Sequence, residues 1–462
     1  MTRDLPPEII LLICQNLCRK DIIRLLTINW NWFTIVGTLL YNEIVLYTRH
    51  DLYAYRNLFN ETRRRRNVTQ DHGFYSRQNY GHFVRTLDLS KYQAKHIITD
   101  TILDDLTRDC INLERLNLYN CHAISRKALW HVMDNCPRIR HLNLAFATKV
   151  DAKFLVHDRT RFIETLNIDG INDFFSTCKG KDIAKIRLSS LRTLECSSSN
   201  VLQIMAALLP YDCLETIVIT GSEARIIQDF LSSCASHLRV VRLKQCLRLT
   251  GETLARLPTS LERLEFEACR VSAQALAYIT MYDHLETLNI RGANISEAEA
   301  LQILHRCSSH CLKRLFTATS LTRGSIDTLL HKFHNLTHVA LKCNANADED
   351  LPSLPSTVTY LEIDDAEERL FRWSSSSIRE LLFLGILTEK VLELFPTWFP
   401  NVEILYVRRM EYTEDQILGF VDQLPNLRGV YSLGRTFTQE KLRRMEQLYH
   451  EWRNSLDFFG PR

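Results

Sequence analysis

The sequence lacks any long apolar run. No stretch of the 462 residues approaches the roughly 20 apolar residues that span a bilayer, and residues 1–7 lack the basic start and apolar core of a signal peptide. The 14 cysteines include no CxxC pair, which argues against a metal or redox pair of that kind. We therefore expect a cytoplasmic or nuclear protein whose thiols are free.

The sequence also lacks a large excess of positive or of negative charge. Lysine and arginine number 57 and aspartate and glutamate 54, which leaves a formal net charge of +3. So small a surplus favours neither nucleic acid nor an anionic membrane as the main partner. We expect neither of them as a partner.

Motifs of common catalytic sites are absent as well. The chain contains no GxxxxGK[ST], GxGxxG, HExxH or GxSxG phrase in a plausible context. His305, Cys307, His310 and Cys311 are of metal-ligand type, but their spacing matches no familiar zinc set. The sequence thus predicts a non-catalytic protein without metal or cofactor.

What the chain does contain is a recurring phrase, apolar-x-x-apolar-x-apolar. Fifteen copies run from VRTLDL at Val84 to LRGVYS at Leu427, and the 343 residues between these starts make fourteen steps of about 24.5 residues. This period lies within the window of about 20 to 29 residues that is typical of leucine-rich repeats. IAKIRL at Ile183 is a competing start beside Leu191. The other copies begin at Leu113, Ile139, Ile163, Leu191, Leu214, Leu238, Leu261, Leu285, Leu312, Leu336, Val358, Ile378 and Val402.

Helical patterns separate these phrases. Ser296 to Glu299 and Thr413 to Gln416 have the form of capping boxes, each followed by apolar residues at helical spacing. One short strand and one helix per repeat cannot bury their apolar faces alone, so neighbours must stack. We predict an α/β leucine-rich-repeat solenoid with a curved parallel sheet inside and helices outside. Further N-cap positions are predicted at Ser125, Thr250, Ser272, Thr322, Thr388 and Thr438.

Several cysteines follow the repeat period. Cys121, Cys246 and Cys269 each stand eight places after the first apolar residue of a phrase, and these repeats resemble the cysteine-containing subtype of leucine-rich repeats. A thiol tied to the repeat period indicates a small buried hydrophobic residue. We predict the same structural role just before a strand, at Cys110, Cys136, Cys213, Cys234, Cys307 and Cys311.

Residues 5–41 have no counterpart in the rest of the chain. Leu5-Pro6 places proline at a helix start, Glu8 suits the positive end of that helix, and Asp21 is a candidate cap of a second helix. Apolar side chains recur along both helices and continue past Trp32. About forty residues rarely supply a self-sufficient core, which favours a docking module. The alternative is a helical cap that seals the first repeat.

The stretch LPPEIILLICQNLCRKDIIRLLTINWNWFTI resembles an F-box, although Tyr41 stands where tryptophan is usual and Asn29 where serine or cysteine is common. Together with the repeats, nearly the whole chain resembles the F-box/leucine-rich-repeat family. The resemblance implies that the F-box binds the Skp-type adaptor of a cullin-RING ubiquitin ligase and that the solenoid holds a substrate protein. It implies adaptor contacts at Leu5, Pro6, Pro7, Ile9, Ile10, Ile13, Leu17, Ile22, Leu25, Leu26 and Trp32.

The domain plan follows from these patterns. We predict an F-box over residues 1–46, a linker over 47–83, the solenoid over 84–437, and a capping helix and tail over 438–462. Four consecutive arginines, Arg63 to Arg66, lie in the linker. They indicate either a solvated linker face or a nuclear import signal.

Alternate residues of each strand predict a substrate surface. If the leucines point into the core, positions three, five and seven of each phrase share the opposite face. Charged side chains alternate in sign there, which suggests mutual neutralisation as much as ligand binding, and the basic ones could accept a phosphate: Arg242, Lys244, Glu265, Glu267 and Arg291. Alternatively, the register drifts and buries the late positions, or the terminal helix covers them. The predicted substrate-binding residues are Phe316, Tyr360, Leu382, Leu384, Ile404, Tyr406, Tyr431 and Leu433.

The sequence therefore suggests a monomeric substrate receptor within an SCF-type ubiquitin ligase, in which transfer occurs on other subunits. Catalysis would then rest on proximity, because a held target makes an intermolecular step effectively intramolecular. The alternatives are a scaffold that uses the adaptor without causing degradation, and a solenoid that binds no ligase.

Overall fold

The computed structural model describes residues 5–17, 19–68, 79–208, 213–234, 237–246, 248–291, 293, 295–308, 310–343, 354–363, 373–387, 389–410, 423–427 and 429–432. Two compact units make up the chain, Met1–Leu238 and Arg239–Arg462. No helix of the described residues is long and apolar enough to cross a membrane.

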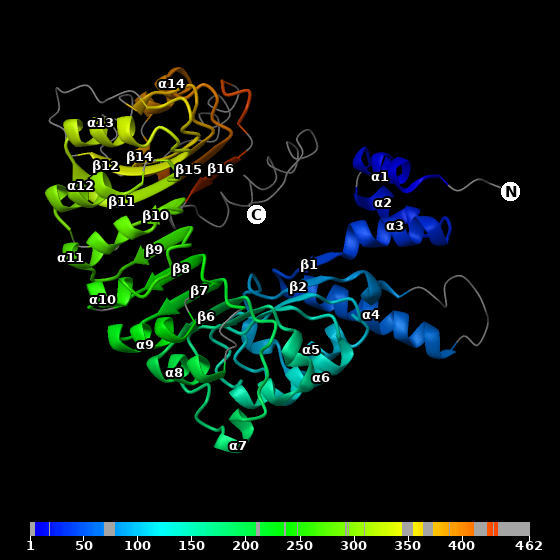
Figure 1. Cartoon of the computed structure of the whole chain (residues 1–462). Coiled ribbons are helices and arrows are strands. Elements are labelled where there is room, and N and C mark those ends of the chain that lie inside the picture. The colour runs from blue at the N-terminus through cyan, green and yellow to red at the C-terminus, as the bar shows by residue number, and fades with distance from the viewer. Residues whose placement is uncertain are drawn as a thin grey trace. The chain divides into compact units, whose positions relative to one another are not determined.

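The first unit begins with three helices, α1 (Pro7–Gln15), α2 (Arg19–Leu25) and α3 (Trp30–Tyr41) (Figure 1). Proline starts α1, and the side chain of Asn29 accepts the backbone N–H of Trp32 at 3.0 Å to start α3. Phe33 packs edge-on against Tyr80 and Phe83, which ties the helices to the first repeats. The buried core of this helical unit consists of Ile10, Cys14, Leu26, Trp32, Phe33 and Val36.

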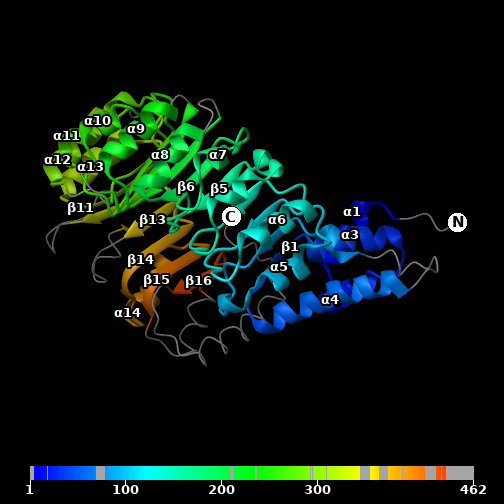
Figure 2. The ribbon, with the colours of Figure 1, turned by 90° about the horizontal axis from the view of Figure 1, so that it is seen from below.

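Within the first unit, parallel strands then follow in chain order, each paired with the next. Those of the first unit are β1 (Glu43–Val45), β2 (Thr86–Asp88), β3 (Arg115–Asn117), β4 (His141–Asn143), β5 (Thr165–Ile168), β6 (Thr193–Ser197) and β7 (Thr216–Thr220). Between them lie α4 (Arg49–Val68), α5 (Asp100–Thr107), α6 (Arg126–Asn135), α7 (Gly180–Ile183), α8 (Ser199–Leu208) and α9 (Ala224–Cys234), with 3-10 turns η2 (Tyr80–Phe83), η3 (Lys95–Ile97), η4 (Ala152–Val156) and η5 (Asp158–Phe162). Helices α4, α5 and α6 pack side by side (Figure 2).

The second unit repeats this plan. Its strands are β8 (Val240–Lys244), β9 (Arg263–Glu267), β10 (Thr287–Asn289), β11 (Arg314–Leu321), β12 (His338–Cys343), β13 (Tyr360–Ile363), β14 (Glu380–Leu387), β15 (Ile404–Met410) and β16 (Gly429–Ser432). Its helices are α10 (Gly251–Leu254), α11 (Ala273–Leu276), η7 (Ala277–Met281), α12 (Glu297–Arg306), α13 (Arg323–Lys332) and α14 (Glu389–Trp398). Helices α10 to α13 lie along one face of the strands (Figure 1). We call the opposite face the open strand face.

The repeat phrase defines the core. Its first apolar residue is at most 5% exposed in all fifteen copies, from Val84 to Leu427. The competing start at Ile183 is rejected, because strand β6 follows Leu191 and Ile183 ends α7. The predicted α/β leucine-rich-repeat solenoid is thereby confirmed.

The boundary before the repeats differs from the predicted one. Strand β1 pairs with β2 and lies inside the segment assigned to the F-box, so the sheet begins one repeat earlier than expected. Tyr41, Ile44 and Leu46 in fact obey the repeat phrase, and Ile44 and Leu46 are buried. The predicted linker contains α4, a helix of 20 residues that packs on α5.

The first arginine of the basic run takes part in this packing. The Arg63 guanidinium donates to Asp109 at 2.5 Å and also to the Asp105 backbone carbonyl, and only 14% of its side chain is exposed. At Arg63, therefore, the run is a structural contact rather than a solvated face.

Helix caps largely follow the prediction. Ser296 and Glu299 form the capping box of α12, and Thr250 and Ser272 cap α10 and α11 through their hydroxyls. Ser125 and Thr322 stand at N-cap positions, but their hydroxyls donate to carboxylates of the preceding repeats, Asp100 and Glu297. Thr388, Thr413 to Gln416 and Thr438 lie outside the described residues.

In the turn that follows each strand from β3 to β9, one residue adopts a left-handed backbone. The residues are Asn120, Phe146, Gly170, Ser198, Gly221, Gln245 and Ala268. Glycine and asparagine suit this position, whereas an aromatic residue there is strained. Phe146 is nevertheless present, with φ 59°, and its ring lies over Gly170.

The cysteines of the repeat period are buried as predicted. Cys121, Cys246 and Cys269 are at most 2% exposed. Burial raises the pKa of Cys121 to about 12, so the thiol stays protonated. Before the strands, Cys110, Cys136 and Cys307 are buried, Cys213 and Cys311 are half-buried, and the side chain of Cys234 lies outside the described residues.

Candidate functional site

The helical unit exposes many large apolar side chains for its size. We call this set the apolar docking set. Ile9 and Leu12 belong to one face of α1, and Leu12 is 56% exposed. The members of the set are Leu5, Ile9, Leu11, Leu12, Ile23, Ile28, Trp30 and Leu39.

Local contacts bring part of this set together. The Asn31 side chain donates to the Leu5 carbonyl at 3.3 Å, which holds the segment before α1 against the start of α3. Trp30 lies at that start and is half-exposed, with its ring centroid 5.3 Å from that of Phe33. The backbone at Leu5 therefore lies beside the start of α3, next to Trp30 in sequence.

The predicted adaptor contacts divide by burial. Leu5, Pro6, Pro7 and Ile9 are exposed, whereas Ile13, Leu17, Ile22 and Leu25 are half-buried. Ile10, Leu26 and Trp32 are buried within the helical unit, so their side chains stabilise its core instead of facing a partner. Sequence reasoning gave no docking role to Leu11, Leu12, Ile23, Ile28, Trp30 and Leu39, because apolarity alone does not tell which face of a short helix is covered.

The open strand face of the second unit carries the predicted substrate residues. Phe316, Tyr360, Leu382, Leu384, Ile404 and Tyr406 are half-buried there, between strand positions that are fully buried. The described part of this segment therefore shows no drift of register into the core. Tyr431 belongs to β16 but its side chain is not described, and Leu433 and residues 438–462 lie outside the described residues.

Two side-chain rows run across this face. Strand pairing aligns Arg263, Thr287, Arg314, His338, Tyr360 and Glu380 in the first row. The second row comprises Glu265, Asn289, Phe316, Ala340, Glu362, Leu382 and Tyr406. A hollow of about 410 Å³ lies over both rows, from Arg242 to Leu382.

Ion pairs neutralise much of the charge on this face. Arg242 lies 3.3 Å from Glu265, and Lys244 lies 3.3 Å from Glu267. The predicted mutual neutralisation is confirmed for these pairs. Arg263 also approaches Glu265, at 3.6 Å, so two guanidinium groups share that carboxylate.

An aromatic cluster is held in place next to these charges. The rings of His338 and Tyr360 stack with centroids 5.3 Å apart, and Phe316 meets Tyr360 edge-on. Buried Glu362 accepts hydrogen bonds from the Tyr360 hydroxyl and from Arg291, whose guanidinium also lies over Phe316. Glu362 therefore fixes the cluster before any partner arrives.

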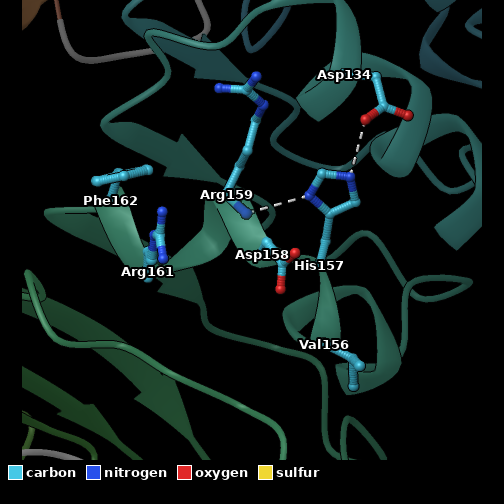
Figure 3. Close-up of a pocket in the computed structure, with 7 residues that line it drawn as sticks. All are labelled: Asp134, Val156, His157, Asp158, Arg159, Arg161 and Phe162. Carbon is cyan, nitrogen blue, oxygen red and sulfur yellow. Dashed lines mark hydrogen bonds and ion pairs between the residues drawn. The ribbon is translucent and has the colours of Figure 1, made fainter.

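A second hollow, of about 550 Å³, lies in the first unit beside η4 and η5 (Figure 3). His157 donates from Nε2 to Asp134 at 3.1 Å and accepts the Arg159 backbone N–H with Nδ1 at 3.3 Å. This histidine caps η5, and the lining residues include no serine, threonine or cysteine to act as a nucleophile. We assign His157 a structural role.

Metal-ligand types do not gather among the described residues. No group of three histidine, cysteine or acidic side chains there is placed to hold a metal ion. Among the residues of metal-ligand type between 305 and 311, the Cys307 thiol is buried and donates to the Ile303 carbonyl. The ring of His310 lies edge-on to that of His334, with centroids 6.5 Å apart.

Comparisons with known proteins add little to this description. No protein-family model and no curated protein matches the sequence. Among solved structures, the chain is similar to one in a complex of Rad7 and Elc1 from yeast, at 14% identity and a TM-score of 0.40, covering 83% of this chain and 93% of that one. An internalin from Listeria monocytogenes matches at 13% identity and a TM-score of 0.31, covering 87% and 98% of the two chains.

A third similar chain comes from a TLR13–ssRNA13 complex. It matches at 14% identity and a TM-score of 0.34, covering 79% of this chain and 52% of that one.

Proposed function

We propose that this chain is the substrate-recognition subunit of an SCF-type ubiquitin ligase. The helical unit docks on a Skp-type adaptor joined to a cullin-RING core, and the open strand face binds a substrate protein. The receptor supplies geometry and carries out no chemistry itself, because ubiquitin transfer occurs on other subunits.

The observation that carries this proposal is the balance of buried and exposed side chains in the helical unit. Six residues form its buried core, while eight large apolar side chains are exposed on it. So many exposed apolar side chains on a unit of about forty residues favour an interaction surface, and half-exposed aromatics such as Trp30 are frequent anchors there. The F-box resemblance of this segment, whose implied adaptor contacts share Leu5 and Ile9 with the apolar docking set, supplies the identity of the partner.

The test is co-purification of the full chain from cells, scored for the Skp-type adaptor and the cullin. We compare the wild type with Ile9→Asp, which places a charge in the apolar docking set. Aspartate is tolerated in the first turn of α1, so the helix is not expected to unfold. We expect recovery of adaptor and cullin to fall at least tenfold.

Ile111→Asp is the matched control. Ile111 and Ile9 are both 43% exposed, but Ile111 lies between α5 and β3. Its variant should recover adaptor and cullin as the wild type does. If the wild type recovers no adaptor, the helical unit only caps the first repeat. Recovery of the adaptor without turnover of any captured protein would favour a scaffold over a ligase receptor.

A further inference from the structure

Among the described side chains on the open strand face of the second unit, the guanidinium of Arg314 forms no ion pair with a carboxylate of that face. Arg314 is half-buried and lines the hollow of about 410 Å³. Among the described residues it takes part in none of the ion pairs of this face, where Glu265 serves Arg242 and Arg263 and Glu362 serves Arg291. Glu286, which directly precedes strand β10, forms an ion pair with Lys313, with 2.6 Å between its carboxylate and the ammonium group.

The arrangement of the first row lets two guanidinium groups act together. Arg263 and Arg314 flank Thr287 on the strands either side of it. Adjacent strands lie about 4.8 Å apart, so the two arginine backbones are roughly 10 Å apart, and both long side chains can reach one group above the short Thr287. A charge-assisted pair of arginines suits a carboxylate or a phosphate.

The positive charge of these arginines also shifts the pKa values of neighbouring groups. Burial, together with the neighbouring Arg242 and Arg314, lowers the pKa of Arg263. Burial and the nearby Arg314 lower the pKa of His338 to about 4, so this imidazole is neutral at physiological pH. Neutral His338 stacks on Tyr360 and extends the hollow from the arginines onto an aromatic floor.

We propose that Arg263 and Arg314 bind an anionic side chain of an extended peptide, whose neighbouring residue lies on the His338, Tyr360 and Phe316 rings. This inference rests on the proposed function, since the peptide would belong to the substrate. The positive charge at one end of the hollow selects the anionic side chain, and the preformed apolar surface beside it receives the neighbouring residue of the peptide. The anion is a glutamate or aspartate carboxylate or a phosphate.

The experiment measures peptide capture by the immobilised full chain without adaptor. Four libraries of capped octapeptides are fixed at the fourth position as glutamate, phosphoserine, glutamine or lysine, and their other positions are randomised among uncharged residues. We expect at least tenfold enrichment of glutamate or phosphoserine over glutamine, because charge-assisted hydrogen bonds are among the strongest in proteins. Enrichment of both shows carboxylate recognition, and enrichment of phosphoserine alone shows phosphate recognition.

Variants tie the selection to the site. Arg314→Gln should abolish the enrichment, and Arg314→Lys should keep part of it, because lysine retains the charge but loses the planar fork. Arg379→Gln is the matched control, since Arg379 is also half-buried but lies outside the hollow, 3.9 Å from Glu403. It should leave the enrichment unchanged.

Three results overturn the proposal: no enrichment of the acidic libraries, enrichment that survives Arg314→Gln, or stronger capture of a single-stranded oligonucleotide than of the acidic peptides. None of these results bears on the adaptor. Co-purification of Arg314→Gln with adaptor and cullin separates failure of this inference from failure of the proposed function.

Discussion

The most direct test of the repeat geometry is a comparison of two glycines. Gly170 and Gly221 both adopt a left-handed backbone after a strand, with φ of 71° and 65°. A Cβ at Gly221 would meet nothing within 4 Å, whereas a Cβ at Gly170 would overlap Cδ1 of Phe146. The Gly170 amide also donates to the Ser197 hydroxyl at 2.7 Å, so this backbone cannot easily move away.

The expected magnitudes follow from these contacts. Gly221→Ala should reduce the free energy of unfolding by about 1–2 kcal/mol, which is the cost of a left-handed conformation for an L-residue. Gly170→Ala places an L-residue in the same left-handed conformation and must also displace the Phe146 ring. The free energy of unfolding should therefore fall by about 2–5 kcal/mol once overpacking is included. Phe146 is 39% exposed, so its ring can move partly into solvent, which favours the lower half of this range.

The assay is urea unfolding followed by far-ultraviolet circular dichroism, with both alanine variants also made in a Phe146→Ala background. There the two glycine substitutions should cost nearly the same, because the clashing ring is gone. Equal losses in the wild-type background would refute the steric argument. A neutral Gly221→Ala would refute the backbone argument.

Three further predictions concern the second unit and the thiols. His338 has a folded-state pKa near 4, so its contribution to stability is full above pH of about 6.5 and is lost as the pH falls toward 4. His338→Gln should therefore flatten the dependence of the free energy of unfolding on pH between pH 7 and 5. An unchanged pH dependence would contradict the buried neutral imidazole. Glu362→Gln should cost about 2 kcal/mol in urea unfolding, less than the roughly 3–5 kcal/mol of a fully buried pair because about a third of Arg291 is exposed. Exposed Glu393→Gln should cost nothing measurable, and equal losses for the two glutamate variants would argue against the Glu362 network. Native-state maleimide labelling should modify half-buried Cys178, Cys213 and Cys311 before the buried thiols of the described residues. Rapid labelling of these buried thiols would disprove their burial: Cys14, Cys110, Cys121, Cys136, Cys196, Cys246, Cys269 and Cys307.

Prediction from sequence succeeded where a pattern recurs. The phrase beginning at Val84 predicted the strands because its period of two marks a buried strand face and its spacing marks the repeat. Prediction failed before Val84. Strand β1 matches the phrase once there, but helix α4 lies between β1 and β2 in the sequence. A single copy carries no periodicity, so this strand was assigned to the F-box instead.

The docking surface was predicted less well for a related reason. Ile9 and Ile10 are chemically alike, yet Ile9 is exposed and Ile10 is completely buried. The direction of each side chain depends on how α1 packs against α3, and a helix of nine residues gives too few turns for the sequence to fix that phase. Leu12 and Trp30 were missed because their exposure follows from the same packing.

The sequence by itself determined the repeat architecture, the buried cysteines and the neutralising charge pairs, because each depends on positions repeated at a fixed period. Only the tertiary structure decided which apolar residues of the helical unit face outward, and that Arg63 of α4 is bound by Asp109 in the turn after α5. It also decided that Glu362 reaches Arg291 across 71 residues of chain, while Arg314 forms no ion pair with any carboxylate in the described part of the chain. Such pairings join side chains that no local pattern relates, so packing alone settles which charges remain for a partner.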